Sequence, residues 1–171
     1  MEIYTPYQPP TIKIPFDVTK KFHVFLSFCG KDVRKTFVDH LYESLCVAGL
    51  RVFLDSEDFK KGKDIDSTLK MPIETSHIVI PIFSTLYAES PWCLEEAARM
   101  IRSNGFIIPL FYDVEPSDVR YPQRNGGLFA RAFQNHYTHL DRQDEKTIEE
   151  WKKALHQISF CSGWTREAEF G

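Results

Sequence analysis

The chain has 171 residues, of which 43% are hydrophobic and 26% are charged, as is typical of one soluble globular domain. Its formal net charge of −3 provides no broad basic surface for a nucleic-acid backbone, so no nucleic-acid partner is expected. No apolar run approaches the roughly 20 residues that a membrane-spanning helix needs, and residues 1–15 lack the pattern of a signal peptide, so no membrane partner is expected.

The four cysteines, Cys29, Cys46, Cys93 and Cys161, form no CxxC pair and do not have the spacing of a zinc site. They lie within apolar stretches, where thiols usually behave as small buried hydrophobic groups. We therefore expect thiols without disulfides, no metal site, and a reducing location in the cytoplasm or the nucleus.

The first half of the chain predicts a proline-containing extended tail over residues 1–20, followed by two short strands. The apolar run Phe22–Phe28 is typical of a strand buried on both faces of a parallel sheet. Helical spacing of apolar residues predicts a helix over 33–48, ended by Gly49. A second strand is predicted over 51–54, and a polar loop and a further helix follow it.

The second half predicts a third strand over 78–83, in which Pro81 indicates a ladder defect or a place near the sheet edge. Ser90 and Pro91 then predict a capped helix start. A fourth strand is predicted over 106–112. A polar loop over 113–127 and helices over 128–139 and 145–161 complete the chain.

Strands that alternate with helices indicate a parallel sheet with right-handed crossovers. Ligands of such sheets bind at the carboxyl ends of the strands. The loops that follow Phe28, Leu54, Ser84 and Tyr112 are therefore the places where a functional site is expected.

The helix after Pro91 places a carboxylate beside an indole. Its apolar residues cluster on one side, while Trp92 and Glu96 fall together on the opposite side, so substitution of Glu96 is expected to spare the fold. Glu95 does not share that side with Trp92. Two interpretations remain open. Either Trp92 and Glu96 form a surface contact, or the tryptophan covers a neighbouring loop; or the pair forms one wall of a cleft, in which the indole offers a stacking surface.

Motifs over about residues 22–164 resemble, in order, those of plant Toll/interleukin-1 receptor (TIR) domains. They are VFLSF at 24–28 with Gly30 and Asp32, HLY at 40–42, FLD at 53–55 leading to KG at 61–62, WCLEE at 92–96, PLFYDV at 109–114 and SGW at 162–164. The resemblance implies an α/β, flavodoxin-like fold with a five-stranded parallel sheet flanked by helices. It places the TIR domain at residues 21–165, between tails at 1–20 and 166–171.

The resemblance also implies that the domain associates with other TIR domains, as a homo- or hetero-oligomer, and cleaves the bond between nicotinamide and ribose in NAD⁺. NAD⁺ is then a substrate, and no cofactor is expected. Glu96 falls on the catalytic glutamate of the family. Substrate contacts are expected from Trp92, Phe28, Gly30, Asp55 and Tyr87, with the loop over 55–63 as a lid, and self-association from Asp39, His40 and Trp164.

Cys29 stands where the family usually has an arginine. We expect the loss of this arginine to weaken binding of the substrate diphosphate. Two other functions remain open: a TIR interaction module without catalysis, and a flavodoxin-like binder of phosphate or flavin. The second needs a phosphate-cradling loop after Phe28, and residues 29–32 form a poor one.

Overall fold

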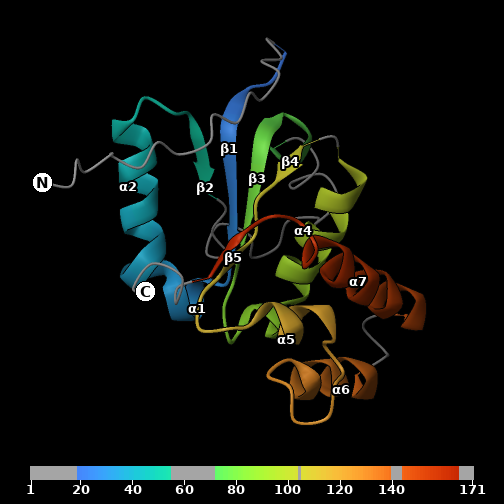
Figure 1. The fold of residues 1–171 in the computed structure, drawn as a ribbon. Helices are drawn as coiled ribbons and strands as arrows, with labels where there is room; N and C mark the ends of the chain where they lie inside the picture. Colours follow the sequence, from blue (N-terminus) through green and yellow to red (C-terminus); the bar gives the residue numbers. More distant parts are fainter. Residues whose placement is uncertain (1–18, 55–71, 104, 140–143, 166–171) are drawn as a thin grey trace, which may run out of the picture.

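The computed structural model describes residues 19–54, 72–103, 105–139 and 144–165 (Figure 1). Their strands form one parallel sheet in the order β2-β1-β3-β5-β6, with β4 also paired to β3. With β4 and β5 counted as one interrupted strand, this is the flavodoxin-like order, as predicted. The strands are β1 (Phe22–Phe28), β2 (Val52–Leu54), β3 (Ser76–Phe83), β4 (Phe106–Ile107), β5 (Leu110–Phe111) and β6 (Trp164–Thr165).

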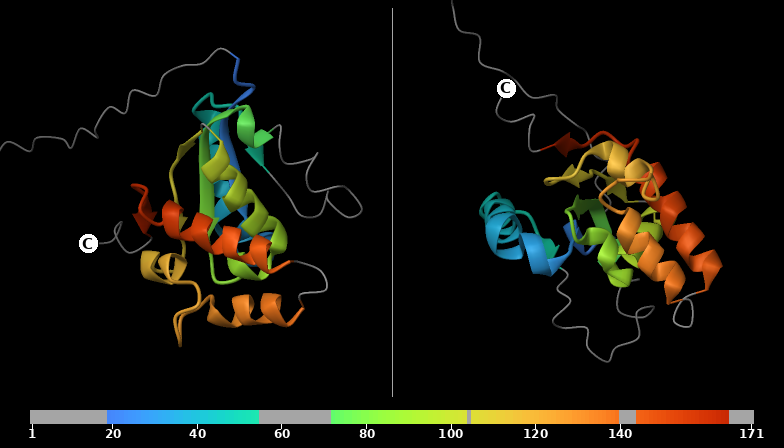
Figure 2. Two further views of the ribbon diagram at one scale, coloured as in Figure 1. Left: turned by 90° about the vertical axis from the view of Figure 1, so that its right-hand side faces the viewer. Right: turned by 90° about the horizontal axis from the view of Figure 1, so that it is seen from below.

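Helices cover both faces of the sheet, with α1, η1 and α2 on one face and α4, α6 and α7 on the other (Figure 2). The described helices are α1 (Gly30–Val33), the π-helical η1 (Arg34–Val38), α2 (Asp39–Val47), the 3₁₀ turn η3 (Tyr87–Glu89), α4 (Pro91–Arg102), α5 (Pro116–Arg120), α6 (Ala130–Thr138) and α7 (Glu145–Ile158).

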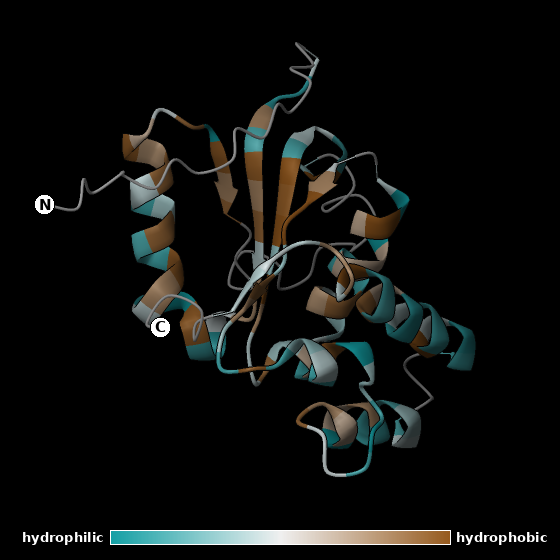
Figure 3. Ribbon diagram, viewed as in Figure 1, coloured by the Kyte–Doolittle hydropathy of each residue, from teal (hydrophilic) through white to brown (hydrophobic). Residues whose placement is uncertain are grey.

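Alternation along β1 decides which side chains meet which helices. Val24, Leu26 and Phe28 pack in the cluster on the α2 face, whereas Phe25 packs with Met100 of α4. Figure 3 shows how β1 and β3 carry the apolar colour at the centre of the sheet. Ser27 lies two residues after Phe25 and therefore on the same side of the strand. Its polar side chain points toward α4.

Local signals placed several element ends correctly. The Ser90 side chain accepts a hydrogen bond from the Cys93 N–H at 3.3 Å, and Pro91 occupies the first turn of α4, as the Ser-Pro pair predicted. Gly49 follows α2 with φ of 83°, the left-handed conformation that favours glycine at a helix end. The first helix starts earlier than expected, at Gly30, and passes through a π-helical segment before α2.

The prolines in the third and fourth predicted strands have a joint explanation. β3 pairs with β4 at Val79 and with β5 at Phe83, and equal spacing along the strands places Pro81 opposite Pro109. The fourth strand is therefore split at Pro109. Pro81 lies in a central strand rather than at an edge. A proline is tolerated there because it lacks an N–H group, and on that side it lies opposite the break between β4 and β5.

Other expectations need correction or lie outside the described residues. The loop predicted over 113–127 contains α5, and α7 ends at Ile158 rather than near residue 161. Cys46 is exposed, although none of the four cysteines is in a disulfide. The loop over 55–63, with Asp55, is outside the described residues, as is the helix after it except for helical residues 72–74.

Gly163 is expected to be intolerant of a side chain. A Cβ atom there would lie 2.3 Å from the Pro109 carbonyl oxygen, which accepts the Trp164 N–H at 3.1 Å to begin the β5–β6 ladder. Gly163→Ala should therefore lower the free energy of unfolding by roughly 1–3 kcal/mol, as overpacked sites do. Urea denaturation measures this, with Gly30→Ala as the control, since its added Cβ would meet only Phe28 Cε2, at 3.9 Å. Equal midpoints for the two variants would contradict the proposed crowding.

Candidate functional site

The Glu96 side chain is held between a strand and its own helix at the carboxyl end of β1. The residue is 1% exposed. One carboxylate oxygen accepts the Trp92 indole N–H at 2.9 Å, and the other accepts the Ser27 hydroxyl. Both donors are neutral groups, so these two hydrogen bonds orient the carboxyl group without forming an ion pair.

Tyr87 extends this arrangement by one further group. Its hydroxyl lies 2.9 Å from Ser27 Oγ and donates to the Cys93 carbonyl at 3.1 Å. Because the Ser27 hydroxyl donates its proton to Glu96, the single phenol proton is shared between Ser27 Oγ and the Cys93 carbonyl oxygen. Burial raises the Tyr87 pKa well above its usual value, and the nearby Glu96 carboxyl group adds to this effect, so the phenol remains a neutral donor.

The sequence pattern placed Trp92 and Glu96 on the side of the helix opposite its apolar residues. In the structure that side does not face solvent. Helix α4 is enclosed on two sides: Leu94 and Ala97 belong to the cluster that includes α7, whereas half-buried Trp92 packs against the cluster of Phe25 and Met100. A helical wheel of one segment assumes one buried side, and that assumption fails for a helix held between a sheet and another helix.

Glu95, the neighbouring carboxylate, has a structural role. It forms ion pairs with Arg99 at 3.3 Å and Arg102 at 3.2 Å, and it accepts the indole N–H of buried Trp151 at 3.2 Å. The two ion pairs lie within α4, and the bond from Trp151 joins α4 to α7. Glu95 thus points away from Ser27, which agrees with the preference for Glu96 as the candidate catalytic residue.

The other predicted substrate residues are only partly brought together. Tyr87 is fully buried beside Ser27, so it reaches Glu96 through that serine. Phe28 is buried in the cluster on the opposite face of the sheet from Glu96, and Gly30 begins α1 next to it. Asp55 lies outside the described residues.

Cys29, where an arginine was expected to face the substrate diphosphate, is directed into the protein. It is buried in the cluster that contains Phe83 and Tyr87, on the α4 face of the sheet. The structure therefore places this thiol behind the site rather than on an open surface of it.

Two residues of the site were not selected from the sequence. Ser27 stands in an apolar run, where its direction toward α4 follows only from strand alternation. Asp32 in α1 accepts the Ser84 hydroxyl and the Leu86 N–H, both at 3.0 Å, and so ties the loops that follow β1 and β3. An acidic residue in the first turn after a strand was the available signal for Asp32.

The predicted association residues lie on two separate parts of the surface. His40 is exposed on α2, and half-buried Asp39 is 3.9 Å from Arg34. Trp164 lies in β6 rather than at the end of the last helix, and it is 57% exposed. Its exposure excludes a role in closing the core, which was one of the two interpretations of a tryptophan at this position.

A further hollow lies at the carboxyl ends of β5 and β6. It encloses about 1120 Å³ and is lined by Phe111, by Thr165 and by the segment that leads into α5, but not by Glu96. No group of three His, Cys, Asp or Glu side chains in the described ranges is arranged to hold a metal ion. No helix within those ranges is long and apolar enough to cross a membrane.

Known proteins are similar to this chain in sequence and in fold. TMV resistance protein N of Nicotiana glutinosa is 40% identical over 146 residues, which are 83% of this chain and 12% of that protein. Probable 2′ cyclic ADP-D-ribose synthase BdTIR of Brachypodium distachyon is 32% identical over 151 residues, which are 88% of this chain and 62% of that protein.

The TIR domains in a structure of the activated Roq1 resistosome, which directly recognizes the pathogen effector XopQ, are 37% identical. They match with a TM-score of 0.74 over 87% of this chain and 90% of that chain. A family model for the TIR domain matches residues 21–169. The chain spans 10–13% of four disease resistance proteins that it matches, so it corresponds to one domain of them. By sequence and by fold, the chain belongs to the TIR domain family.

Proposed function

We propose that this chain is an NAD⁺ glycohydrolase or cyclase of plant immune signalling, which cleaves the nicotinamide–ribose bond after self-association. The observation that carries the proposal is the Glu96 carboxylate, oriented by Trp92 and Ser27 at the carboxyl end of the sheet. The similarity to BdTIR, whose name describes a probable 2′ cyclic ADP-D-ribose synthase, supports this reaction class. The similarity to the TIR domains of the Roq1 resistosome supports the assembly.

The chemistry suits a fixed anion. When the bond between ribose C1′ and the nicotinamide nitrogen breaks, its electron pair leaves with neutral nicotinamide, and positive charge develops on the ribose. A carboxylate already oriented beside that carbon stabilises the charge without reorganising during the reaction. A water oxygen, or a hydroxyl of the same molecule in the cyclase reaction, then bonds to C1′ and loses its proton.

Glu96 is nearly inaccessible in the single chain, and this has a consequence for the mechanism. A ribose can reach the carboxylate only if groups around it move. Of its two hydrogen-bond donors, Ser27 is fully buried in the sheet, whereas the Trp92 indole is only half-buried. We propose that contact with a second TIR domain stabilises the open arrangement. The indole would then stack on a ring of the substrate.

The alternative is a TIR interaction module without catalysis. The enclosed state of Glu96 and the 57% exposure of Trp164 favour it. The two functions separate when the concentrated chain is incubated with NAD⁺ and nicotinamide is measured by chromatography. Nicotinamide release supports the enzyme. Self-association of the chain without any release of nicotinamide would support the non-catalytic interaction module.

Ser27→Ala is expected to lower kcat for nicotinamide release about 10- to 100-fold with little change in KM. The variant removes a charge-assisted hydrogen bond that orients the catalytic carboxylate, and bonds of this kind contribute about 1.5–3 kcal/mol. The matched control is Ser84→Ala, because Ser84 is also buried and donates to a carboxylate, but to Asp32. A similar loss of kcat in both variants would show that general loosening, rather than Glu96 positioning, causes the effect.

A further inference from the structure

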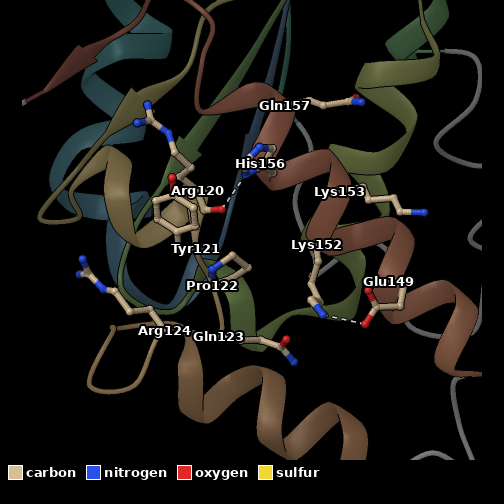
Figure 4. Close-up of a pocket in the computed structure, with 10 residues that line it drawn as sticks. All are labelled: Arg120, Tyr121, Pro122, Gln123, Arg124, Glu149, Lys152, Lys153, His156 and Gln157. Carbon is tan, nitrogen blue, oxygen red and sulfur yellow. Dashed lines mark hydrogen bonds and ion pairs between the residues drawn. The ribbon is translucent and has the colours of Figure 1, made fainter.

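A pocket distinct from the Glu96 site lies between the segment that follows α5 and one side of α7 (Figure 4). It encloses about 570 Å³, which is within the usual range for small-molecule sites. One wall is formed by residues 120–124, and the other by side chains of α7 between Glu149 and Gln157.

The charge of this pocket is opposite to that of the whole chain. The lining has four cations, Arg120, Arg124, Lys152 and Lys153, and one acid, Glu149, which gives 4 − 1 = +3 with His156 neutral. The complete chain carries −3. Asp118, outside the lining, pairs with Arg124 at 3.3 Å and reduces the local excess to +2. The remaining excess favours an anionic ligand.

The rim of the pocket is fixed by contacts within the protein. The Arg120 guanidinium donates to Ser159 and lies over the Phe160 ring, 4.1 Å from its centroid. The His156 ring nitrogen Nδ1 lies 3.1 Å from the Arg120 carbonyl oxygen, which joins α7 to the end of α5. The contacts with Ser159 and Phe160 hold the Arg120 side chain in place, so the charge for a ligand has to come from α7.

One wall offers a flat apolar surface. Tyr121 is 52% exposed, and its ring stands edge-to-face with His156 at 6.0 Å between centroids. Figure 4 shows Tyr121 and Pro122 facing His156, while Lys152 extends from α7 toward the segment that carries Gln123. A half-exposed ring next to cations suits a ligand that combines a planar ring with an anionic group.

The acid in the wall limits the strength of such binding. Glu149 accepts hydrogen bonds from Lys152, at 2.6 Å, and from Tyr137, and these two bonds lower the Glu149 pKa. Its charge therefore persists at neutral pH and opposes an incoming anion. Exposed Lys153 is the cation on this side whose charge is most available to a ligand.

We propose that this pocket binds a nucleoside monophosphate, with the base against Tyr121 and Pro122 and the phosphate held by Lys153. The volume admits one such molecule, and the acidic remainder of the chain disfavours a longer polyanion. The site is separate from Glu96 and does not depend on the function proposed above.

Titration of the chain with AMP, followed by NMR chemical shifts or calorimetry, tests the site. AMP has no nicotinamide to release, so the result does not depend on catalysis. We expect AMP to bind more tightly than adenosine or inorganic phosphate, which each provide one half of the recognition. Lys153→Gln should weaken AMP binding about 2- to 5-fold, as expected for an exposed charge pair, and Glu149→Gln should strengthen it by a similar factor. Tyr121→Ala should weaken AMP and leave phosphate unchanged.

The control is Lys35→Gln, an exposed lysine on η1 at the other face of the sheet, which should leave AMP binding unchanged. AMP binding that is lost in Trp92→Ala but kept in Lys153→Gln and Tyr121→Ala would overturn the proposal, because the nucleotide would then occupy the Glu96 site. Equal affinity for phosphate and AMP would also overturn it. So would NMR shifts of the pocket residues that change with protein concentration in the absence of AMP. The last result would assign the surface to a second copy of the chain.

Discussion

Glu96→Gln is expected to lower kcat/KM for NAD⁺ cleavage by at least about 100-fold, the loss typical of removing one preorganised electrostatic group. Glutamine keeps the shape of the side chain and can still accept the Trp92 N–H, while its amide can donate to Ser27 Oγ. The negative charge disappears and the hydrogen bond with Ser27 reverses its direction, while the shape of the side chain is kept. The melting temperature should therefore stay close to that of the wild type.

The burial of Glu96 changes the choice of substitution. From the sequence, alanine was expected to spare the fold, because the residue was placed away from the core. The structure shows that alanine would leave the Trp92 and Ser27 donors without their acceptor in a buried position, which typically costs about 1–3 kcal/mol per group. Glutamine separates the loss of catalysis from this loss of stability.

Glu95→Gln is the matched control for this prediction, one residue away on the same helix. Its amide oxygen can still accept the Trp151 N–H, although the ion pairs with Arg99 and Arg102 are lost. We expect nearly full activity with a modest drop in melting temperature. If Glu95→Gln lost as much activity as Glu96→Gln, the assignment of the catalytic carboxylate would be wrong.

Dilution is expected to have the second large effect. Where most chains are monomeric, the fraction in a two-chain assembly is proportional to concentration, so specific activity should fall about 10-fold for each 10-fold dilution. The physical reason is the enclosed Glu96, which we propose is opened only by a neighbouring domain. Nicotinamide release measured over a concentration series gives this dependence directly.

His40→Ala should reduce activity at a given concentration without much change in melting temperature, because the side chain is exposed on α2. Trp164→Ala should act in the same direction, since large exposed aromatic residues often anchor interfaces. The control is His139→Ala, an exposed histidine after α6. Constant specific activity across the series, together with a wild-type rate for His40→Ala, would reject assembly-dependent catalysis.

The fold could be predicted wherever a signal was local. The run Phe22–Phe28 became a strand with those bounds, and Ser90 and Pro91 fixed the start of α4, because burial and capping act over a few residues. β6 could not be found in this way. Trp164 and Thr165 are a strand only because they pair with β5, and a two-residue segment carries no periodicity of its own.

The candidate site could be predicted only in part, for a related reason. The four-residue spacing of Trp92 and Glu96 correctly placed the indole beside the carboxylate. The contact between Glu96 and Ser27 joins residues 69 positions apart, so it depends on how α4 packs on the sheet. The helical pattern also could not show that α4 is covered on both sides, and this is why the burial of Glu96 was missed.

The most direct test of the account is a paired product analysis of the concentrated wild-type chain and Glu96→Gln, each incubated with NAD⁺. We predict that the wild type releases nicotinamide in step with the loss of NAD⁺, together with an equal amount of ADP-ribose or a cyclic form of it, while Glu96→Gln does not. Absence of nicotinamide from the wild type at the highest concentration, or equal release by both proteins, would contradict the assignment of Glu96 as the catalytic residue of an NAD⁺-cleaving TIR domain.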